Sequence, residues 1–238
     1  SLDSVIKKAS ETGLKHIINI GINYKTSLKA LNQTKKYPNF ISPTIGIHPA
    51  ETQDLANLDK IKELAKSNAF VALGEMGLDY VKMYTSKEKQ WECFETQLQL
   101  ASELNMPVII HNRHADKDIK AITDNFPNVS KILHCFSSSI QFAELMLNET
   151  TFFSFAGQIT YSKKGKTLTA LKNLPLENIM IETDSPYLTP KTFQGQSNEP
   201  SFITSTLDHV VSCRKEEKEE IISTLYKTTR EFFNINII

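Results

Sequence analysis

Residues 69–111 read AFVALGEMGLDYVKMYTSKEKQWECFETQLQLASELNMPVIIH, and this stretch predicts a strand, a helix and a second strand. The apolar run at 69–75 is short, as expected for a buried strand. The next segment has one apolar face at helical spacing, formed by Trp91, Phe94, Leu98, Ala101 and Leu104. Pro107 then opens a second apolar run at 107–111. A strand, a helix and a strand in this order form a parallel βαβ unit.

The same alternation continues along the rest of the chain. Five more apolar runs predict strands, at 16–21, 40–48, 131–135, 151–157 and 178–184. Helical segments separate them, and a further helix is expected at 1–13. The pattern predicts an α/β fold, a (β/α)8 TIM barrel over a single domain spanning 1–238. Because such a barrel closes with eight strands and seven are visible, we expect the first strand to precede Ser1. An open, doubly wound sheet of seven strands is the alternative.

Composition excludes several classes of protein. Hydrophobic residues make up 40% of the 238 residues, which suffices for a sizeable core. Lys and Arg number 27, as do Asp and Glu, so any nucleic-acid binding must use a local patch. Cys93, Cys135 and Cys213 show no CxxC spacing, which favours reduced thiols. No apolar run is long enough to span a bilayer. We therefore expect a cytoplasmic monomer that does not bind membranes.

Four polar residues occupy the downstream ends of predicted strands. They are Glu75, His111, His134 and Asp184. Such side chains are costly to bury without partners, and the chemistry of a barrel lies at the carboxyl ends of its strands. Together they predict a metal site, with Glu75 and Asp184 also in catalytic roles. Taken singly, each has a structural alternative: a capping acid, a hydrogen-bonded core histidine or a turn-forming aspartate.

Three further residues are candidates for substrate binding. Arg113 lies two residues beyond His111 and could clamp a phosphate with two hydrogen bonds. His48 ends the run at 40–48, and Lys163 follows the run at 151–157 together with two neighbouring lysines. The alternatives are a surface ion pair for Arg113, a structural role for His48 and a solvated loop for Lys163.

The order of motifs along nearly the whole chain resembles the TatD-type metal-dependent deoxyribonucleases of the amidohydrolase-like barrel superfamily. The motifs are GIHP at 46–49, GEMGLDY at 74–80, HNRHA at 111–115, LHCFS at 133–137, ETDSPYL at 182–188 and NEP at 198–200. The resemblance implies that Glu75 bridges two divalent ions and that His111 and His134 hold one of them. It implies that Asp184 helps to hold the other and positions the attacking water.

The resemblance also implies a cofactor and a substrate. Mg²⁺ is the expected ion, with Mn²⁺ and Zn²⁺ as alternatives, two per site in the complete protein. The implied reaction is hydrolysis of DNA phosphodiester bonds, in single strands or at 3′ ends, by metal-activated water.

The chain departs from the family pattern at three places, the third being His114 and Ser138, where relatives often have Asp and Gly. Many relatives carry a His-x-His pair on the first strand, and this sequence has none. Ser197 stands before the NEP motif, where an Arg is common in relatives. Two alternative functions therefore stay open. One is a metallohydrolase of a small amide, lactone or phosphate ester, and the other is a non-catalytic barrel.

Overall fold

The computed structural model describes residues 1–67, 69–161 and 163–236. Its contacts divide the chain into two compact units. The first, here the five-strand unit, contains His16–His134, Asn148–Thr151 and the residues from Phe232 onward. The second, here the two-strand unit, contains Ser1–Lys15, Cys135–Leu147 and Phe152–Glu231. The expectation of a single domain stays a prediction.

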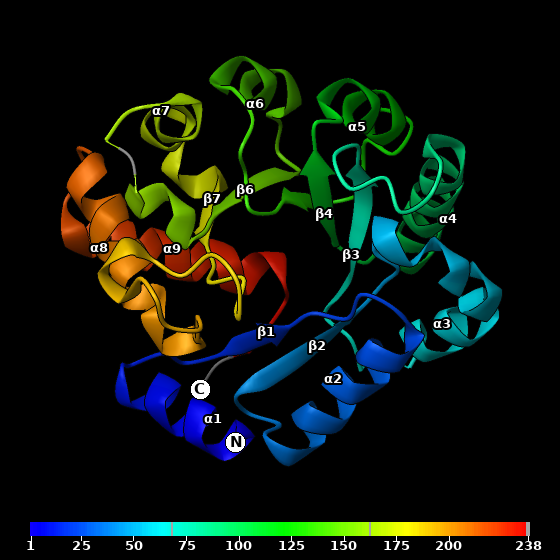
Figure 1. Cartoon of the computed structure of the whole chain (residues 1–238), viewed down its shortest axis with the longest axis horizontal. Coiled ribbons are helices and arrows are strands. Elements are labelled where there is room, and N and C mark those ends of the chain that lie inside the picture. The colour runs from blue at the N-terminus through cyan, green and yellow to red at the C-terminus, as the bar shows by residue number, and fades with distance from the viewer. Residues whose placement is uncertain (68, 162, 237–238) are drawn as a thin grey trace. The chain divides into compact units, whose positions relative to one another are not determined.

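The five-strand unit is a parallel sheet whose strands pair in sequence order. The strands are β1 (Ile17–Asn19), β2 (Ile41–Ile45), β3 (Ala72–Asp79), β4 (Val108–Arg113) and β5 (Lys131–Leu133). Between them run α2 (Tyr24–Lys36), the 3₁₀ helix η1 (Pro49–Asn57), α3 (Leu58–Ala65), α4 (Lys87–Leu104) and α5 (Asp116–Thr123). The four α-helices lie on the same side of these strands (Figure 1).

The two-strand unit pairs β6 (Thr151–Phe155) with β7 (Ile179–Ile181), also in parallel. Its α-helices are α1 (Leu2–Glu11), α6 (Ile140–Met146), α7 (Lys166–Asn173), α8 (Ile203–Cys213) and α9 (Lys218–Phe232). Its 3₁₀ helices are η2 (Gly157–Tyr161), η3 (Leu176–Asn178), η4 (Lys191–Phe193) and η5 (Pro200–Phe202). Within the part of the chain that the structure describes, no helix is both long and apolar enough to cross a membrane.

The strand order confirms the predicted fold class. A doubly wound sheet reverses its strand order at a switch point and carries helices on both faces. Here β1 to β5 follow one another without a reversal, and their helices share one face (Figure 1). This is the arrangement of a (β/α)8 TIM barrel. The strand expected before Ser1 stays a prediction.

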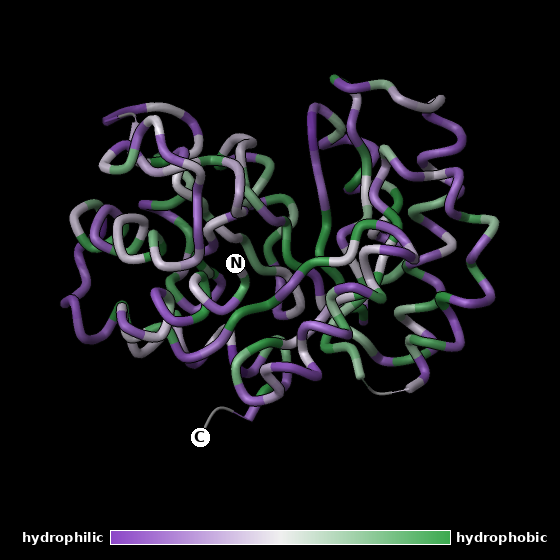
Figure 2. The backbone as a smooth tube through the Cα atoms, turned by 60° about the horizontal axis from the view of Figure 1, so that its bottom comes forward, coloured by the Kyte–Doolittle hydropathy of each residue, from purple (hydrophilic) through white to green (hydrophobic). Residues whose placement is uncertain are grey.

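The core follows the apolar pattern of the sequence. Figure 2 shows hydrophobic stretches along the strands and mixed hydrophobic and hydrophilic residues along the helices. Helix α4 begins after Ser86, whose hydroxyl accepts a hydrogen bond from the Lys89 N–H. The helix buries Phe94 and Leu98 completely, whereas Trp91 at its start is 37% exposed. The predicted apolar face of this helix is therefore confirmed at Phe94, Leu98 and Ala101, whereas Trp91 and Leu104 are only partly buried.

Strand β3 is longer than predicted, and this changes the position of Glu75. The strand runs to Asp79, so the expectation that it ends at Glu75 is wrong. Its pairing with β4 shifts register between Leu73 and Met76, which indicates a β-bulge at Gly74 and Glu75. Met76 and Leu78 beyond the bulge are fully buried. The strand thus continues beyond Glu75, although the polar residue at this position makes the sequence pattern resemble the end of a strand.

Gly77 lies at a close approach of β3 to β4. Its φ is +135°, and a Cβ atom built on it would lie 2.1 Å from the carbonyl oxygen of His111. Gly165 has nearly the same φ, +132°, but nothing lies within 4 Å of its Cβ position. A side chain at either glycine would therefore strain the backbone to a similar degree, but only at Gly77 would it also lack space.

We expect Gly77→Ala to destabilise the protein more than Gly165→Ala. Both substitutions introduce strain of about 1–3 kcal/mol at a positive φ. Gly77→Ala adds the cost of forcing β3 away from β4, about another 1–3 kcal/mol. Urea unfolding of the two variants measures the difference, and an equal loss in both would contradict the close approach of these strands.

Lys131 is a buried cation at the start of β5. The residue is 2% exposed, and its Nζ donates a hydrogen bond to Thr150 Oγ1 at 3.2 Å. Burial lowers the pKa of Lys131 from 10.5 to about 8. Between these two values the unfolded chain binds the proton and the folded protein does not. Folding therefore becomes more favourable as the pH rises from about 8 to 10.5.

We expect Lys131→Met to stabilise the protein at neutral pH, by up to about 3 kcal/mol, because the variant does not bury a charge. The advantage over the wild type should shrink at about pH 10, where the folded wild type has already released its proton. Urea unfolding of both proteins at the two pH values measures it. Other titrating groups cancel in the comparison, so a difference independent of pH would contradict the lowered pKa.

Candidate metal centre

Three imidazole rings surround one carboxylate oxygen in the five-strand unit. Glu75 Oε1 lies 2.7 Å from His134 Nε2 and 2.8 Å from His111 Nδ1. His48 Nε2 lies 3.5 Å from the same oxygen. The four residues come from the bulge of β3, from β4, from the position after β5 and from the start of η1. The structure therefore brings together three of the four predicted metal ligands and one predicted substrate contact.

Glu75 is a buried carboxylate that stays ionised. Its side chain is 13% exposed. Burial alone opposes its ionisation, but the charges and hydrogen bonds of His134 and His111 outweigh that cost and hold the pKa of Glu75 well below its usual value. A buried negative charge at the focus of several imidazoles is an electrostatic setting that favours a bound cation.

His111 lies between two carboxylates. Its Nε2 is 3.3 Å from Asp79 Oδ2, while its Nδ1 faces Glu75. Burial acts to lower the pKa of His111, but the hydrogen bonds with Asp79 and Glu75 raise it overall. When Nε2 donates its proton to Asp79, the lone pair of Nδ1 points toward Glu75. A carboxylate behind a ligating histidine is the usual way to fix the tautomer of such a ring.

Asp79 is the functional residue that the sequence reasoning missed. The residue is 4% exposed. Its Oδ1 accepts hydrogen bonds from the N–H groups of Val81 and Lys82, at 2.9 and 2.8 Å. Burial opposes its ionisation, but the hydrogen bonds from His111 and from these two N–H groups lower the pKa of Asp79 strongly. The available signal was its place in the GEMGLDY motif, four residues beyond Glu75 on the same strand.

His48 presents a hydrogen-bond donor to the centre. Its Nδ1 accepts a hydrogen bond from the Ala50 N–H at 3.0 Å, where it caps the start of η1. Burial lowers the pKa of His48 to about 4, although Glu75 acts in the opposite direction. The ring is therefore neutral at neutral pH, and its proton lies on Nε2, which faces Glu75. In this tautomer His48 suits a contact to a substrate oxygen better than a metal bond.

The side chains in this unit have the composition and spacing that a divalent cation requires. Ligand atoms of His48, Glu75 and His111 all lie within 4.8 Å of one another. His134 reaches the same oxygen of Glu75. Imidazole and carboxylate together accept Mg²⁺, Mn²⁺ or Zn²⁺. The residues therefore fit a divalent metal ion.

Asp184 belongs to the two-strand unit, after the end of β7. Its φ is +55°, and its carbonyl oxygen accepts a hydrogen bond from the Tyr187 N–H at 2.9 Å. Glu182 accepts hydrogen bonds from the Cys135 N–H at 2.7 Å and from Ser154 Oγ at 2.8 Å. Glu182 thus braces the main chain of its own unit. The role of Asp184 as a ligand shared with Glu75 stays a prediction.

The other two predicted substrate contacts are exposed. Arg113 is the last residue of β4, and its carbonyl oxygen accepts a hydrogen bond from the Tyr80 N–H at 2.9 Å. Lys163 lies between η2 and α7 in the two-strand unit. Both substrate roles stay predictions.

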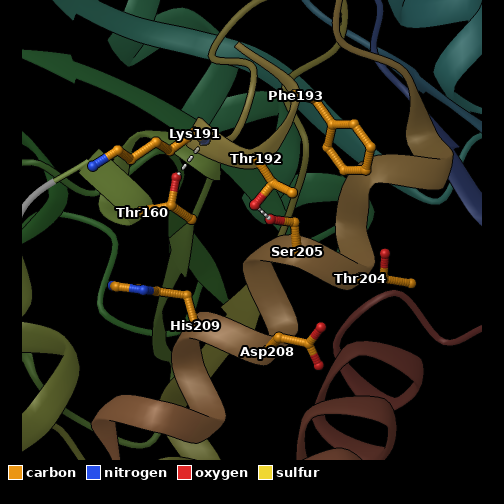
Figure 3. Close-up of a pocket in the computed structure, with 8 residues that line it drawn as sticks. All are labelled: Thr160, Lys191, Thr192, Phe193, Thr204, Ser205, Asp208 and His209. Carbon is orange, nitrogen blue, oxygen red and sulfur yellow. Dashed lines mark hydrogen bonds between the residues drawn. The ribbon is translucent and has the colours of Figure 1, made fainter.

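A separate cavity of about 430 Å³ lies in the two-strand unit (Figure 3). Thr160, Lys191, Ser205 and His209 are among the side chains that line it. The Thr160 hydroxyl accepts a hydrogen bond from the Lys191 N–H, and the hydroxyls of Thr192 and Ser205 bond each other (Figure 3). Its hydroxyl groups are thus used within the fold, and none of the predicted catalytic residues lines it.

A carboxylate and imidazoles gathered on parallel strands of a barrel define a metal-dependent hydrolase. The chain belongs to the family described as TatD related DNase, whose model matches residues 1–234. This membership confirms the resemblance that the motifs indicated.

Individual relatives agree with this assignment. The chain is 35% identical to the protein described as an uncharacterized metal-dependent hydrolase, YabD, of Bacillus subtilis, over 99% of this chain and 93% of that protein. It is 31% identical to the 3′-5′ ssDNA/RNA exonuclease TatD of Erwinia tasmaniensis, over 98% of this chain and 93% of that protein. The crystal structure of the TatD homolog YjjV of Escherichia coli superposes with a TM-score of 0.90 at 26% identity, over 99% of this chain and 92% of that chain.

We expect Glu75→Gln to weaken binding of Mn²⁺ by at least about 10-fold, because the substitution removes the charge on which the imidazoles converge. Isothermal titration calorimetry of the purified protein, stripped of metal and titrated with MnCl₂, measures the Kd. The control is Glu103→Gln, which removes an exposed carboxylate from the end of α4. An unchanged Kd in Glu75→Gln would place the metal elsewhere.

Proposed function

We propose that the protein is a divalent-metal-dependent nuclease that hydrolyses phosphodiester bonds of DNA, in single strands or from 3′ ends. The observation that carries this proposal is the convergence of His111 and His134 on one oxygen of Glu75. It is supported by relatives that are named 3′-5′ ssDNA/RNA exonucleases and that align with 97–98% of this chain.

The proposed site contains Glu75, His111, His134 and Asp184 as metal ligands, with Mg²⁺ favoured over Mn²⁺ or Zn²⁺ and two ions in the complete protein. When bound, the metal supplies a Lewis acid and lowers the pKa of water enough to make hydroxide available near neutral pH. Glu75 contributes a charge that is already ionised in the folded protein. Asp79 lies 3.3 Å from His111 Nε2 and can accept its hydrogen bond, which would leave Nδ1 of a neutral ring available to the metal.

The chain also contributes substrate contacts. His48 directs its Nε2–H toward the centre, where it can donate a hydrogen bond to a phosphate oxygen. Arg113 and Lys163 supply positive charge for the phosphates of the strand. Asp184 accepts the proton of the attacking water. Each of these roles is a proposal that follows from the position or the chemistry of the residue.

A second candidate function is hydrolysis of a small amide, lactone or phosphate ester. The chain has equal numbers of basic and acidic residues, which favours a small substrate over a polyanion. The relative YabD is described only as a metal-dependent hydrolase. Under a third possibility, a non-catalytic barrel, the protein would turn over no substrate at all.

We expect the Mg²⁺- or Mn²⁺-loaded protein to shorten a 5′-labelled single-stranded oligodeoxynucleotide from its 3′ end. Glu75→Gln and Asp184→Asn should each lower kcat/KM by about 100-fold or more, because each removes a charged group from the reacting centre. Denaturing gel electrophoresis of timed samples measures the product ladder. Chelation of the metal by EDTA should stop the reaction.

The matched control is Asp208→Asn, which removes an exposed aspartate from α8 in the same unit as Asp184. It should leave the nuclease activity unchanged. Parallel assays with p-nitrophenyl esters of acetate and phosphate distinguish the candidate functions. Turnover of a small ester with intact DNA would support the second function, and turnover of neither substrate would support the third.

A further inference from the structure

The loop between β3 and α4, residues 80–86, exposes an unusual number of apolar side chains beside the metal centre. Val81 is 48% exposed, Met83 is 47% exposed and Tyr84 is 67% exposed. A contiguous exposed apolar patch on a folded protein often marks a binding surface. Because the loop directly follows Asp79, the patch starts two residues after the carboxylate that contacts His111.

The loop is held in place at both ends. Gln90 is fully buried, and its side-chain amide donates hydrogen bonds to the carbonyl oxygens of Asp79 and Thr85. Its Oε1 accepts a hydrogen bond from the Asp79 N–H at 2.8 Å. The main chain between these points is therefore held by one glutamine. The same amide lies 3.9 Å from the sulfur of Met83, and Tyr84 is the most exposed of the three apolar side chains.

A second set of contacts fixes the start of the loop. The Tyr80 hydroxyl donates a hydrogen bond to Asp118 Oδ2 at 2.7 Å and accepts one from Trp91 Nε1 at 2.6 Å. The loop thus lies beside α5, which carries Asp118, as Figure 1 also shows. The Lys87 ammonium lies 4.1 Å from the centre of the Tyr80 ring. The apolar side chains are consequently presented on a rigid support.

Within residues 80–89 the exposed charges are mostly positive, whereas Asp79 and Asp118 lie at the base of the loop. Lys82, Lys87 and Lys89 are exposed in and directly after the loop, and Glu88 is the exposed acid among residues 80–89. Arg113 shares a backbone hydrogen bond with Tyr80. A combination of stacking side chains and cations is the chemistry that binds single-stranded nucleic acid, whose bases are unpaired and whose phosphates are negative. If a second copy of this chain bound the same patch, the lysines of the two copies would face and repel each other.

We propose that Val81, Met83 and Tyr84 form a platform for the unpaired bases of a single strand whose phosphodiester lies at the metal centre. This inference rests on the proposed nuclease function, and it explains why the enzyme would prefer single-stranded to duplex DNA. In a duplex the bases are stacked and paired, so they offer no face to Tyr84. Tyr84 carries the stacking contact, and the lysines contact the phosphates.

The test compares Glu75→Gln with Glu75→Gln/Tyr84→Ala, so that binding is measured without cleavage. Fluorescence anisotropy with a labelled oligothymidylate in the presence of Mg²⁺ should show a Kd about 5-fold or more weaker in the double variant, because stacking on the tyrosine is lost. An oligomer of the same length with abasic sites should bind both proteins equally. The control is Tyr226→Ala in the same background, which removes a partly exposed tyrosine from α9.

Kinetics with the otherwise unaltered enzyme give a second readout. Tyr84→Ala should raise the KM for single-stranded DNA by a similar factor and leave both its kcat and its hydrolysis of bis(p-nitrophenyl) phosphate unchanged. Equal Kd values for oligothymidylate, or an equal loss with the abasic oligomer, would overturn the platform while leaving the nuclease function intact. A wild-type protein that cleaves bis(p-nitrophenyl) phosphate but no DNA would overturn the proposed function itself. A dimer that dissociates on Tyr84→Ala in sedimentation velocity would assign the patch to a second copy and overturn the platform.

Discussion

The ionised carboxylate of Glu75 is the constraint on which the five-strand unit depends. A buried charge is tolerated only where polar partners surround it. His111 and His134 supply these partners at 2.8 and 2.7 Å, each from a different strand position. The order of the strands is therefore coupled to the site, because β3, β4 and β5 must lie side by side for the three side chains to meet on one oxygen. A sheet in any other order would leave Glu75 without compensation.

The bulge in β3 is the local feature that delivers this carboxylate. A regular strand sends alternate side chains to opposite faces, and one extra residue changes which side chains face the site. Gly74 has a φ of +136°, and a Cβ atom there would lie 2.7 Å from the carbonyl oxygen of Ile109. The same bulge lets the strand continue through Met76 and Leu78, which fill the core on the way to Asp79. One strand thereby contributes both Glu75 and the carboxylate that supports His111.

The sequence predicts the repeating architecture well because its signals are local. Apolar runs and helical spacing predict the seven strands found in the described part of the chain and most of the helices between them. The polar residues that interrupt the runs point to Glu75, His111 and His134, which the structure brings together. It does not predict the end of β3, since a bulge looks like the end of an apolar run. It does not identify Asp79 either, because that role depends on which ring nitrogen of His111 faces which strand. The tautomer of His48 is set by the N–H of Ala50, and no periodicity encodes that contact.

Asp79 connects the metal centre to the exposed loop, since its two oxygens serve two different purposes. Oδ2 faces the ring of His111, and Oδ1 holds the N–H groups of Val81 and Lys82 at the start of the exposed loop. A displacement of the loop that moved this carboxylate would therefore also disturb the orientation of a predicted metal ligand. Because Gln90 pins the same segment from the other side, the loop is better suited to rigid docking than to closing over a substrate. The apolar side chains and the metal centre are consequently held at a fixed separation, which the proposed single strand would have to span.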